Sequence, residues 1–371
     1  MRGRRVAAVA MAAIITTAGA VGTDAPGAAA GGPGEAIIAD VNGDAHPDRV
    51  VLDHLVGAST SCRAVVGLGL PGGGYGAGRP YTYLSLPAAE PNCPDMGVGL
   101  NLDADPPAEL AVTWFAGPPS TVPHTLLALD NFQVSGGFNT IYQPSFIGTA
   151  DFNGDGRQDV YQWTDQGEGF ATYLATGTGT LTPGPVRHCS GPLTSRLADF
   201  NRNGAMDVAI AYVEGCGDYF SGVVVVLDDG RLIHLHTDVE GFASWTAETG
   251  DANRDGVPDV TTHNDLTGEV ATFIGVGNGT FVRSPVAIRD YPTVSGLKAT
   301  GIVVLGNDFA ATDRVRVSIW TPPRHGTVKV TTNGTVIYTP HPVHGGTDVF
   351  IYRLTQDGRT SNAAVSLRIV G

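Results

Sequence analysis

The chain contains five short acidic segments in which oxygen-bearing side chains alternate with other residues. The clearest of them, DFNGDGRQD at 151–159, places Asp151, Asn153, Asp155 and Asp159 at positions 1, 3, 5 and 9. Oxygen ligands at alternate positions suit a hard cation of the size of calcium, and glycine at position 6 permits the sharp turn. Without a cation, three carboxylates at this spacing would repel one another. The segment therefore predicts a calcium-binding loop.

The other four segments follow the same pattern, with differences that affect the expected affinity. They span 40–48, 101–109, 199–207 and 251–259, and the five loops are numbered one to five in chain order. Loop four has two carboxylates and is expected to bind more weakly, and loop two has Pro106 at the turn and is expected to be empty or distorted. The predicted metal ligands, with position 7 offering its backbone carbonyl, are Asp40, Asn42, Asp44, His46, Asp48, Asp103, Asp105, Glu109, Asp151, Asn153, Asp155, Arg157, Asp159, Asp199, Asn201, Asn203, Ala205, Asp207, Asp251, Asn253, Asp255, Val257 and Asp259.

The sequence excludes an EF-hand at these loops. An EF-hand shares the pattern D-x-[DN]-x-[DN]-G, but it also needs glutamate at position 12 and flanking helices. Position 12 is never glutamate in the five loops, and short Val/Ile/Thr/Tyr-rich segments typical of strands flank them. The remaining alternative is an acidic β-turn that binds no metal.

The loops start 61, 50, 48 and 52 residues apart, which indicates a tandem repeat. In the third unit, the apolar segments FIGTA, DVYQW and ATYLAT surround the loop, and a glycine-containing turn precedes a last strand. Four short strands per unit are typical of a β-propeller blade. We therefore predict an all-β fold in which residues 31–291 form about five four-stranded blades. The segment 284–296 is expected to pair beside the first blade and close the ring.

The loop DFNGDG, the repeat length and closing turns such as GNGTF (277–281) resemble FG-GAP or VCBS-type repeats. These repeats occur in integrin α-subunit propellers and in many exported bacterial proteins. The resemblance covers about residues 33–291 and implies a calcium-dependent β-propeller whose loops brace each blade. It departs from the integrin pattern in blade number, because integrins have seven blades and this sequence shows five units.

The repeat stops near residue 297, and residues 297–371 have a different pattern. Asn333-Gly334 lies between two β-type segments and is a strong hairpin signal, and period-2 alternation in DVFIYRL and AAVSLRI predicts a small β-sandwich. The stretches PPRHGTV, NGTVIYTP and GTDVFIYRL resemble bacterial cadherin-like or Ig-like domains of surface adhesins. That resemblance implies calcium contacts at Asp308 and Asp348, and the alternative is a spacer module that binds no ligand.

The N-terminal segment has the features of a secretory signal peptide. Arg2, Arg4 and Arg5 precede an apolar run to about Ala20, and small residues follow, so residues 1–30 are expected to be removed on export. No other segment reaches 18 uninterrupted apolar residues, so no membrane span is expected. The mature protein is therefore expected to be secreted.

Four cysteines are present, and an even number in an exported chain suggests two disulfides. Their positions favour the pairs Cys62–Cys93 and Cys189–Cys216 among the three pairings that four cysteines allow. Free buried thiols are the alternative.

Few residues suggest catalysis or a ligand site outside the loops. No nucleophile elbow, zinc-protease motif or phosphate-binding loop is present, so no catalytic residue is assigned. His234 and His236 alternate on one strand and could supply two metal ligands, but no third is visible. Trp114, Trp163 and Tyr212 follow their loops at similar positions and either fill the cores between blades or form a glycan or peptide site.

The formal net charge of −14 argues against nucleic acid as a partner, because phosphate binding needs a basic surface. We expect a monomeric, exported, calcium-stabilised binding or adhesion protein whose propeller face recognises an extracellular glycan or surface protein. One alternative is a secreted enzyme that acts on polysaccharide or phospholipid in the propeller funnel. Another is a purely structural envelope protein.

Overall fold

The computed structural model describes residues 32–53, 61–86, 92–103, 105–115, 117–122, 125–141, 143–164, 169–189, 191–213, 221–238, 244–342 and 345–370. The predicted signal peptide and Cys216 lie outside these residues. Within them, the secondary structure consists of β-strands and one short 3-10 helix, η1 (Val304–Gly306), which confirms the predicted all-β fold. No helix of the described part is long and apolar enough to span a membrane.

Five four-stranded antiparallel sheets precede the C-terminal domain, one for each predicted repeat unit. The strands of each sheet are neighbours in chain order, so each unit is a meander. The first two sheets consist of β1 (Ile37–Ala39), β2 (Asp48–Asp53), β3 (Ser61–Gly67) and β4 (Arg79–Ser85), then β5 (Met96–Leu100), β6 (Glu109–Thr113), β7 (Leu126–Asp130) and β8 (Gln133–Phe138). The third and fourth consist of β9 (Phe146–Ala150), β10 (Asp159–Thr164), β11 (Gly169–Ala175) and β12 (Leu181–His188), then β13 (Gly191–Ala198), β14 (Asp207–Val213), β15 (Ser221–Val226) and β16 (Leu232–Asp238). The fifth consists of β17 (Trp245–Gly250), β18 (Asp259–Asn264), β19 (Val270–Gly275) and β20 (Phe281–Arg283).

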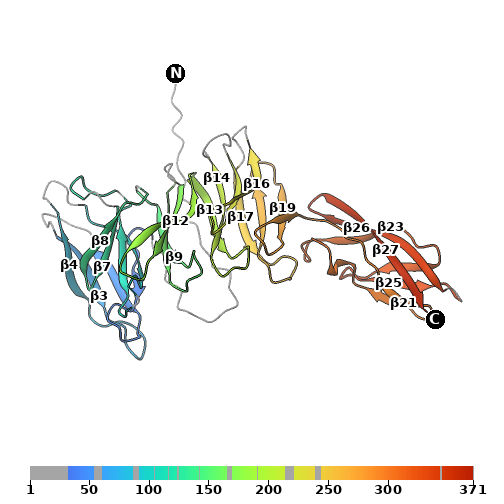
Figure 1. The fold of residues 1–371 in the computed structure, drawn as a ribbon, viewed down its shortest axis with the longest axis horizontal. Helices are drawn as coiled ribbons and strands as arrows, with labels where there is room; N and C mark the ends of the chain where they lie inside the picture. The colour runs from blue at the N-terminus through green and yellow to red at the C-terminus, as the bar shows by residue number, and fades with distance from the viewer. Residues whose placement is uncertain are drawn as a thin grey trace, which may run out of the picture.

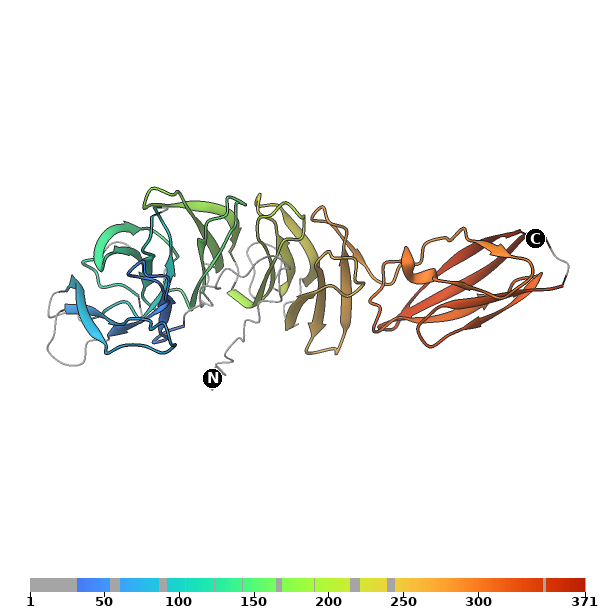
Figure 2. The same ribbon diagram turned by 90° about the horizontal axis from the view of Figure 1, so that it is seen from below.

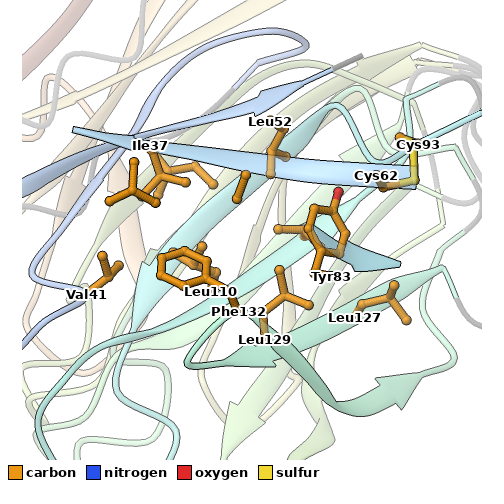
Figure 3. Close-up of a cluster of buried hydrophobic side chains, with 14 of the residues drawn as sticks. Ile37, Val41, Leu52, Cys62, Tyr83, Cys93, Leu110, Leu127, Leu129 and Phe132 are labelled. Carbon is orange, nitrogen blue, oxygen red and sulfur yellow. A yellow bond between two sulfur atoms is a disulfide. The ribbon is translucent and has the colours of Figure 1, made fainter. Parts of the chain in front are cut away.

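Neighbouring sheets pack face to face, and each interface has its own apolar core. Figure 3 shows the first interface, where Ile37 and Leu52 of the first sheet lie near Leu110, Leu127 and Leu129 of the second. Three similar clusters fill the next three interfaces. Central strands are buried on both faces, which is why β15 has the continuous apolar run VVVV rather than an alternating pattern. Each fully buried aliphatic side chain stabilises the stack by about 1.5–3 kcal/mol.

The five sheets follow one another along the long axis of the molecule. Figures 1 and 2 show the first sheet (blue) at one end and the fifth sheet, with β17 and β19, next to the C-terminal domain. The expected ring closure by residues 284–296 is wrong, because this segment pairs within the C-terminal domain, where Val294 is buried in the core. The pairings are Val286 with Phe309, Asp290 with Val365, and β21 (Thr293–Ser295) with β27 (Arg359–Val370).

The C-terminal domain is a two-sheet sandwich, as predicted. One sheet has the order β21–β27–β26–β23 and the other β22–β25–β24. Inward-facing residues such as Tyr338, Phe350 and Tyr352 fill its core. The Asn333-Gly334 turn joins two antiparallel strands, and Gly334 has φ 84°, a left-handed conformation that favours glycine. The remaining strands are β22 (Thr300–Ile302), β23 (Arg316–Thr321), β24 (Gly326–Val330), β25 (Val336–Pro340) and β26 (Gly346–Gln356).

Polar contacts join the sandwich to the fifth sheet. The backbone N–H of Thr312 donates to the carbonyl of Ala252, in loop five, at 2.9 Å. The Arg314 guanidinium donates to the hydroxyl of Thr261 at 3.5 Å and also to the hydroxyl of Thr272. Loop five therefore lies at the boundary between the repeat region and the sandwich.

Candidate metal-binding loops

Loop three connects β9 to β10 and is shaped by its own acidic residues. The Asp151 carboxylate accepts the backbone N–H of Gly154 at 2.7 Å and that of Gly156 at 2.8 Å. The Asn153 side-chain oxygen accepts the N–H of Asp155 at 3.0 Å, and Asn153 Nδ2 donates to Asp155 Oδ2 at 3.0 Å. Such side-chain-to-backbone bonds stabilise a turn locally. The shape of the loop therefore follows from residues within the loop.

Loops one, four and five repeat this geometry. The N–H of position 6 donates to the carboxylate of position 1 at 2.7 Å in loop one, 2.8 Å in loop four and 2.9 Å in loop five. Positions 4 and 6 have φ values between 60° and 91° in loops one, three, four and five. Ala45 therefore adopts the left-handed conformation that glycine adopts at position 6 of the other three loops. This conformation costs a non-glycine residue about 1–2 kcal/mol.

Loop two has a different geometry because of its prolines. Position 6 is Pro106, which has no N–H to donate to position 1, and the Pro106–Pro107 peptide bond is cis. Asn101, at position 1, instead donates its side-chain amide to the carbonyl of Asp105 at 2.9 Å. The structure thus shows the distortion expected from the proline, and the occupancy of this loop stays a prediction.

The carboxylate at position 9 is buried and attaches each loop to its own sheet. In loop three, one oxygen of Asp159 accepts the N–H of Phe152 at 2.8 Å and the other accepts the N–H of Ala175 at 2.8 Å. Phe152 is position 2 of the loop and Ala175 ends the third strand, so the carboxylate joins these two parts of the unit. The residues that make the same pair of bonds in loops one, four and five are Asp48, Asp207 and Asp259.

Burial raises the pKa of four position-9 groups. Loss of hydration raises the pKa of Asp159 to about 6, that of Asp207 to about 7 and that of Asp259 to about 6. The backbone N–H bonds favour the ionised form and offset part of this rise. Burial also raises the pKa of Glu109, at position 9 of loop two. A cation nearby would favour the ionised form of each group.

Backbone hydrogen bonds connect the loops to the neighbouring sheets. The carbonyl of Asp40 in loop one accepts the N–H of Ala108 in loop two at 2.8 Å. The carbonyl of Asp151 in loop three accepts the N–H of Met206 in loop four at 2.7 Å. The remaining bonds are from Gly179 to the carbonyl of Leu102, from Gly279 to that of Phe200 and from Thr312 to that of Ala252. A loop that adopts one conformation therefore also favours the hydrogen bonds between its own unit and the next one.

The donor set of loops one, three, four and five suits calcium. Positions 1, 3 and 5 offer carboxylate and amide oxygens, position 7 offers a carbonyl, and oxygen ligands of this kind are those calcium prefers. Within the described ranges, no three His, Cys, Asp or Glu side chains gather into a metal-binding group. A cation would therefore depend on the amide and carbonyl oxygens as well as on the carboxylates.

The predicted aromatic site residues lie mostly inside the protein. Trp114 is 1% exposed and its Nε1 donates to the carbonyl of Asn92 at 2.8 Å, and Tyr212 is 2% exposed. Trp163 is half-buried and stacks on Phe146, with ring centroids 5.8 Å apart. The rings of Trp114 and Tyr212 therefore fill cores between sheets and are not accessible to a glycan.

The two histidines of β16 have different surroundings. The ring of His236 stacks on Trp245, with centroids 3.9 Å apart, and its Nε2 lies 2.9 Å from the hydroxyl of Thr262. Burial lowers the pKa of His236 to about 4, so this ring is neutral at pH 7. His234 is exposed, and no third metal ligand joins the pair in the described part of the chain.

The disulfide Cys62–Cys93 is present, as predicted. It joins β3 of the first sheet to the segment before β5 of the second, and both cysteines are buried. Disulfides form in oxidising compartments, which is consistent with a location outside the cytoplasm. The predicted pair Cys189–Cys216 lies partly outside the described residues, because Cys216 is not among them.

Two features were not expected from the sequence. A cavity of about 480 Å³ lies between loop five and residues 312–314 of the sandwich, and its walls include Glu248 and His263. On the sandwich, Trp320 is 55% exposed and has the guanidinium of Arg353 over its ring. The cavity forms where residues 312–314 meet the fifth sheet, and the Trp320–Arg353 contact forms between β23 and β26. The sequence signal for the second feature was Trp320 at an outward position of its strand, and the first had none.

Two family models match parts of the chain. Residues 134–210 match the FG-GAP-like repeat, and residues 283–369 match the bacterial Ig domain. The chain thus contains an FG-GAP-like repeat and a C-terminal bacterial Ig domain, as the sequence motifs predicted. This combination suggests an extracellular protein with a binding or structural role.

Two solved structures that match the chain are distant from it. The endo-fucoidan hydrolase MfFcnA4 from glycoside hydrolase family 107 matches at 12% identity over 63% of this chain and 38% of that chain, with a TM-score of 0.19. A variant of that enzyme matches at 13% identity over 74% of this chain and 39% of that chain, with a TM-score of 0.21. The chain spans about two fifths of their length, and similarity this low carries no functional argument. No curated protein matches the chain.

Proposed function

We propose that this chain, which combines an FG-GAP-like repeat with a bacterial Ig domain, is an exported binding protein stabilised by calcium. In this proposal, a surface of the five sheets recognises an extracellular glycan or a surface protein, and the sandwich is a spacer. The observation that carries the proposal is the shared geometry of loops one, three, four and five, in which position 1 accepts the N–H of position 6.

The calcium would be held by the oxygens of positions 1, 3 and 5 and by the carbonyl of position 7, while position 9 anchors the loop. In loop five these side chains are Asp251, Asn253 and Asp255. The cation would offset the repulsion between the carboxylates and order each loop. Because the loops hydrogen-bond to neighbouring units, ordered loops would also stiffen the row of sheets. A surface that is already rigid loses less entropy when it binds a ligand.

Replacement of Asp255 by Asn tests the calcium sites. The Asn side chain keeps an oxygen for the N–H of Val257, which Asp255 accepts at 2.8 Å, but it removes one charge from loop five. Calcium at 100 times its Kd should stabilise a protein with one binding site by about 2.7 kcal/mol. Asp255→Asn should lose most of the stabilisation that calcium in loop five provides. In chelator, the variant should unfold within about 0.5 kcal/mol of the wild type.

Asp229→Asn is the matched control, because Asp229 is an exposed carboxylate outside the loops that pairs with Arg231. The control should keep the full stabilisation by calcium in thermal unfolding experiments with calcium and with chelator. The proposal fails if calcium does not stabilise the wild type, or if Asp255→Asn lowers stability equally with and without calcium.

A further inference from the structure

The sandwich has the opposite charge balance from the rest of the chain. Residues 297–371 contain eight Lys and Arg, four Asp and no Glu, although the whole chain has a formal net charge of −14. Two of the four aspartates, Asp308 and Asp348, are buried and accept hydrogen bonds from tyrosine hydroxyls. The other two, Asp313 and Asp357, pair with Arg314 at the junction with the fifth sheet.

The outward face of β23, β26 and β27 carries positive charge without acidic residues. The side chains of β26 alternate, so that Asp348 faces inward while Val349 and Arg353 face outward. Arg316 on β23 and Arg368 on β27 are exposed on the same face. No described carboxylate forms an ion pair with any of these three arginines. We call this surface the cationic sheet face, and Figure 1 shows its three strands side by side.

An exposed tryptophan lies within the cationic sheet face. Trp320 is 55% exposed at an irregular position of the edge strand β23, where the register shifts between Ile319 and Thr321. The guanidinium of Arg353 lies 3.4 Å from the centre of the Trp320 ring, and Arg353 Nε donates to Asn362 Oδ1 at 2.9 Å. These contacts hold the ring and the guanidinium in one arrangement, with the guanidinium over one face of the ring, while Trp320 as a whole stays exposed.

We propose that the cationic sheet face binds an acidic polysaccharide with carboxylate groups. The planar guanidinium matches a carboxylate with two parallel hydrogen bonds, and an exposed aromatic ring can stack on a sugar ring. The face is also long, since β26 has 11 residues and β27 has 12. At a rise of about 3.3 Å per residue it extends over roughly 35 Å, the length of several sugar units.

The spacing along the face supports an extended ligand. Arg316 pairs in register with Thr355, near one end of β26, and Arg368 pairs with Thr347, near the other end. Arg353 and Trp320 lie between them, with Arg353 two residues from Thr355 and six from Thr347 along β26, so two arginines lie toward one end of the face and the third lies at the other end. A linear polyanion would contact these arginines one after another. A nucleic acid would have one exposed aromatic ring on this face, that of Trp320, on which its bases could stack.

This inference deepens the proposed function by naming a class of ligand, an acidic polysaccharide. It rests on the proposed function only in that it takes the protein to be a binding protein. The site does not include the calcium loops. Its test uses the full chain with polygalacturonate, and with the fully methyl-esterified polymer as the uncharged comparison. Binding is measured by affinity electrophoresis and calorimetry, with calcium and with chelator.

We expect binding to polygalacturonate in both calcium and chelator, weakening as salt rises, and little binding to the esterified polymer. Arg353→Gln should weaken binding about tenfold, because a hydrogen bond to a charged group is lost. Trp320→Ala should also weaken it. Lys329→Gln is the matched control, because Lys329 is exposed on β24 in the other sheet of the sandwich and its replacement removes the same charge.

The inference would be overturned if the protein bound both polymers equally, or if Lys329→Gln and Arg353→Gln weakened binding to the same extent. It would also be overturned if binding required calcium and did not change in Arg353→Gln, or if DNA bound as tightly as polygalacturonate. Concentration-dependent self-association that Arg353→Gln abolishes, without polysaccharide binding, would instead assign the face to a second copy of the chain. Thermal unfolding in calcium on the same samples tests the proposed function separately, so the two can fail independently.

Discussion

At the scale of single residues, carboxylates of one loop have two different roles. In loop three, Asp151 and Asp155 are on the surface and shape the turn, while Asp159 is fully buried and accepts two backbone N–H groups. A buried carboxylate with two such bonds stabilises the fold, and the loss of one bond leaves a buried donor unpaired. The sequence pattern gave all three the same role as ligands, because it shows spacing but not burial.

Replacement of Asp159 by Asn tests this structural role. One carboxylate oxygen becomes an amide nitrogen, which cannot accept the N–H of Phe152 or of Ala175. We expect the free energy of unfolding to fall by about 1–3 kcal/mol in chelator as well as in calcium. Urea unfolding measures this loss, with Asp255→Asn, at position 5 of loop five, as the control that should lose stability mainly in calcium. A loss for Asp159→Asn that disappears in chelator would contradict the structural role.

At the scale of elements, the buried side chain of Asp308 and the segment around Ile288, at the start of the sandwich, are both joined to Tyr352 of β26. The Tyr352 hydroxyl lies 2.8 and 2.9 Å from the two carboxylate oxygens of Asp308 and 2.9 Å from the carbonyl of Ile288. Burial raises the pKa of Asp308 to about 6. When Asp308 is protonated, it can donate to the tyrosine oxygen while the tyrosine donates to Ile288, so each hydrogen has an acceptor.

This arrangement predicts that stability depends on pH in a defined range. The pKa of Asp308 is about 6 in the fold and 3.8 as its ordinary value, so the unfolded chain releases the proton first as pH rises. The contribution of Asp308 is therefore complete below about pH 4 and is lost through about pH 6, with up to about 3 kcal/mol at stake.

Unfolding free energies at pH 4 and pH 7 measure this dependence when wild type is compared with Asp308→Asn, which stays uncharged. The wild type should lose more stability than the variant between these two pH values. Asp313→Asn removes an exposed carboxylate of the same domain and should behave as the wild type. If the difference between wild type and Asp308→Asn is the same at both pH values, the assignment is wrong.

At the scale of the whole molecule, the five sheets and the sandwich form an elongated row (Figure 2). Apolar cores join neighbouring sheets, whereas the junction between the fifth sheet and the sandwich includes several polar contacts. Arg314 is central there, because it contacts two threonines of the fifth sheet and also pairs with Asp357 at 3.3 Å. Hydrogen bonds and an ion pair of Arg314 therefore contribute to this junction.

Replacement of Arg314 by Ala should loosen this junction without unfolding either part. The loss of its hydrogen bonds should weaken the junction by about 1–3 kcal/mol. Small-angle X-ray scattering should then show a broader distribution of interatomic distances, while the thermal transition of the repeat region stays in place. Arg316→Ala, on an exposed position of the sandwich, is the control. An unchanged scattering profile for Arg314→Ala would show that other contacts fix the orientation.

The amino-acid sequence by itself determined the features that depend on near neighbours. The turn of loop three, the Asn333-Gly334 hairpin and the four strands of each unit could be predicted, because their bonds or patterns span only a few residues. The pair Cys62–Cys93 was also predicted, from the grouping of the cysteines and without knowledge of the fold. Only the tertiary structure decided that 284–296 joins the sandwich, that Trp114 is buried, and that Trp320 lies beside Arg353. These outcomes depend on which distant strands meet, and the free energy of burying side chains between sheets, rather than local backbone preference, selects those partners.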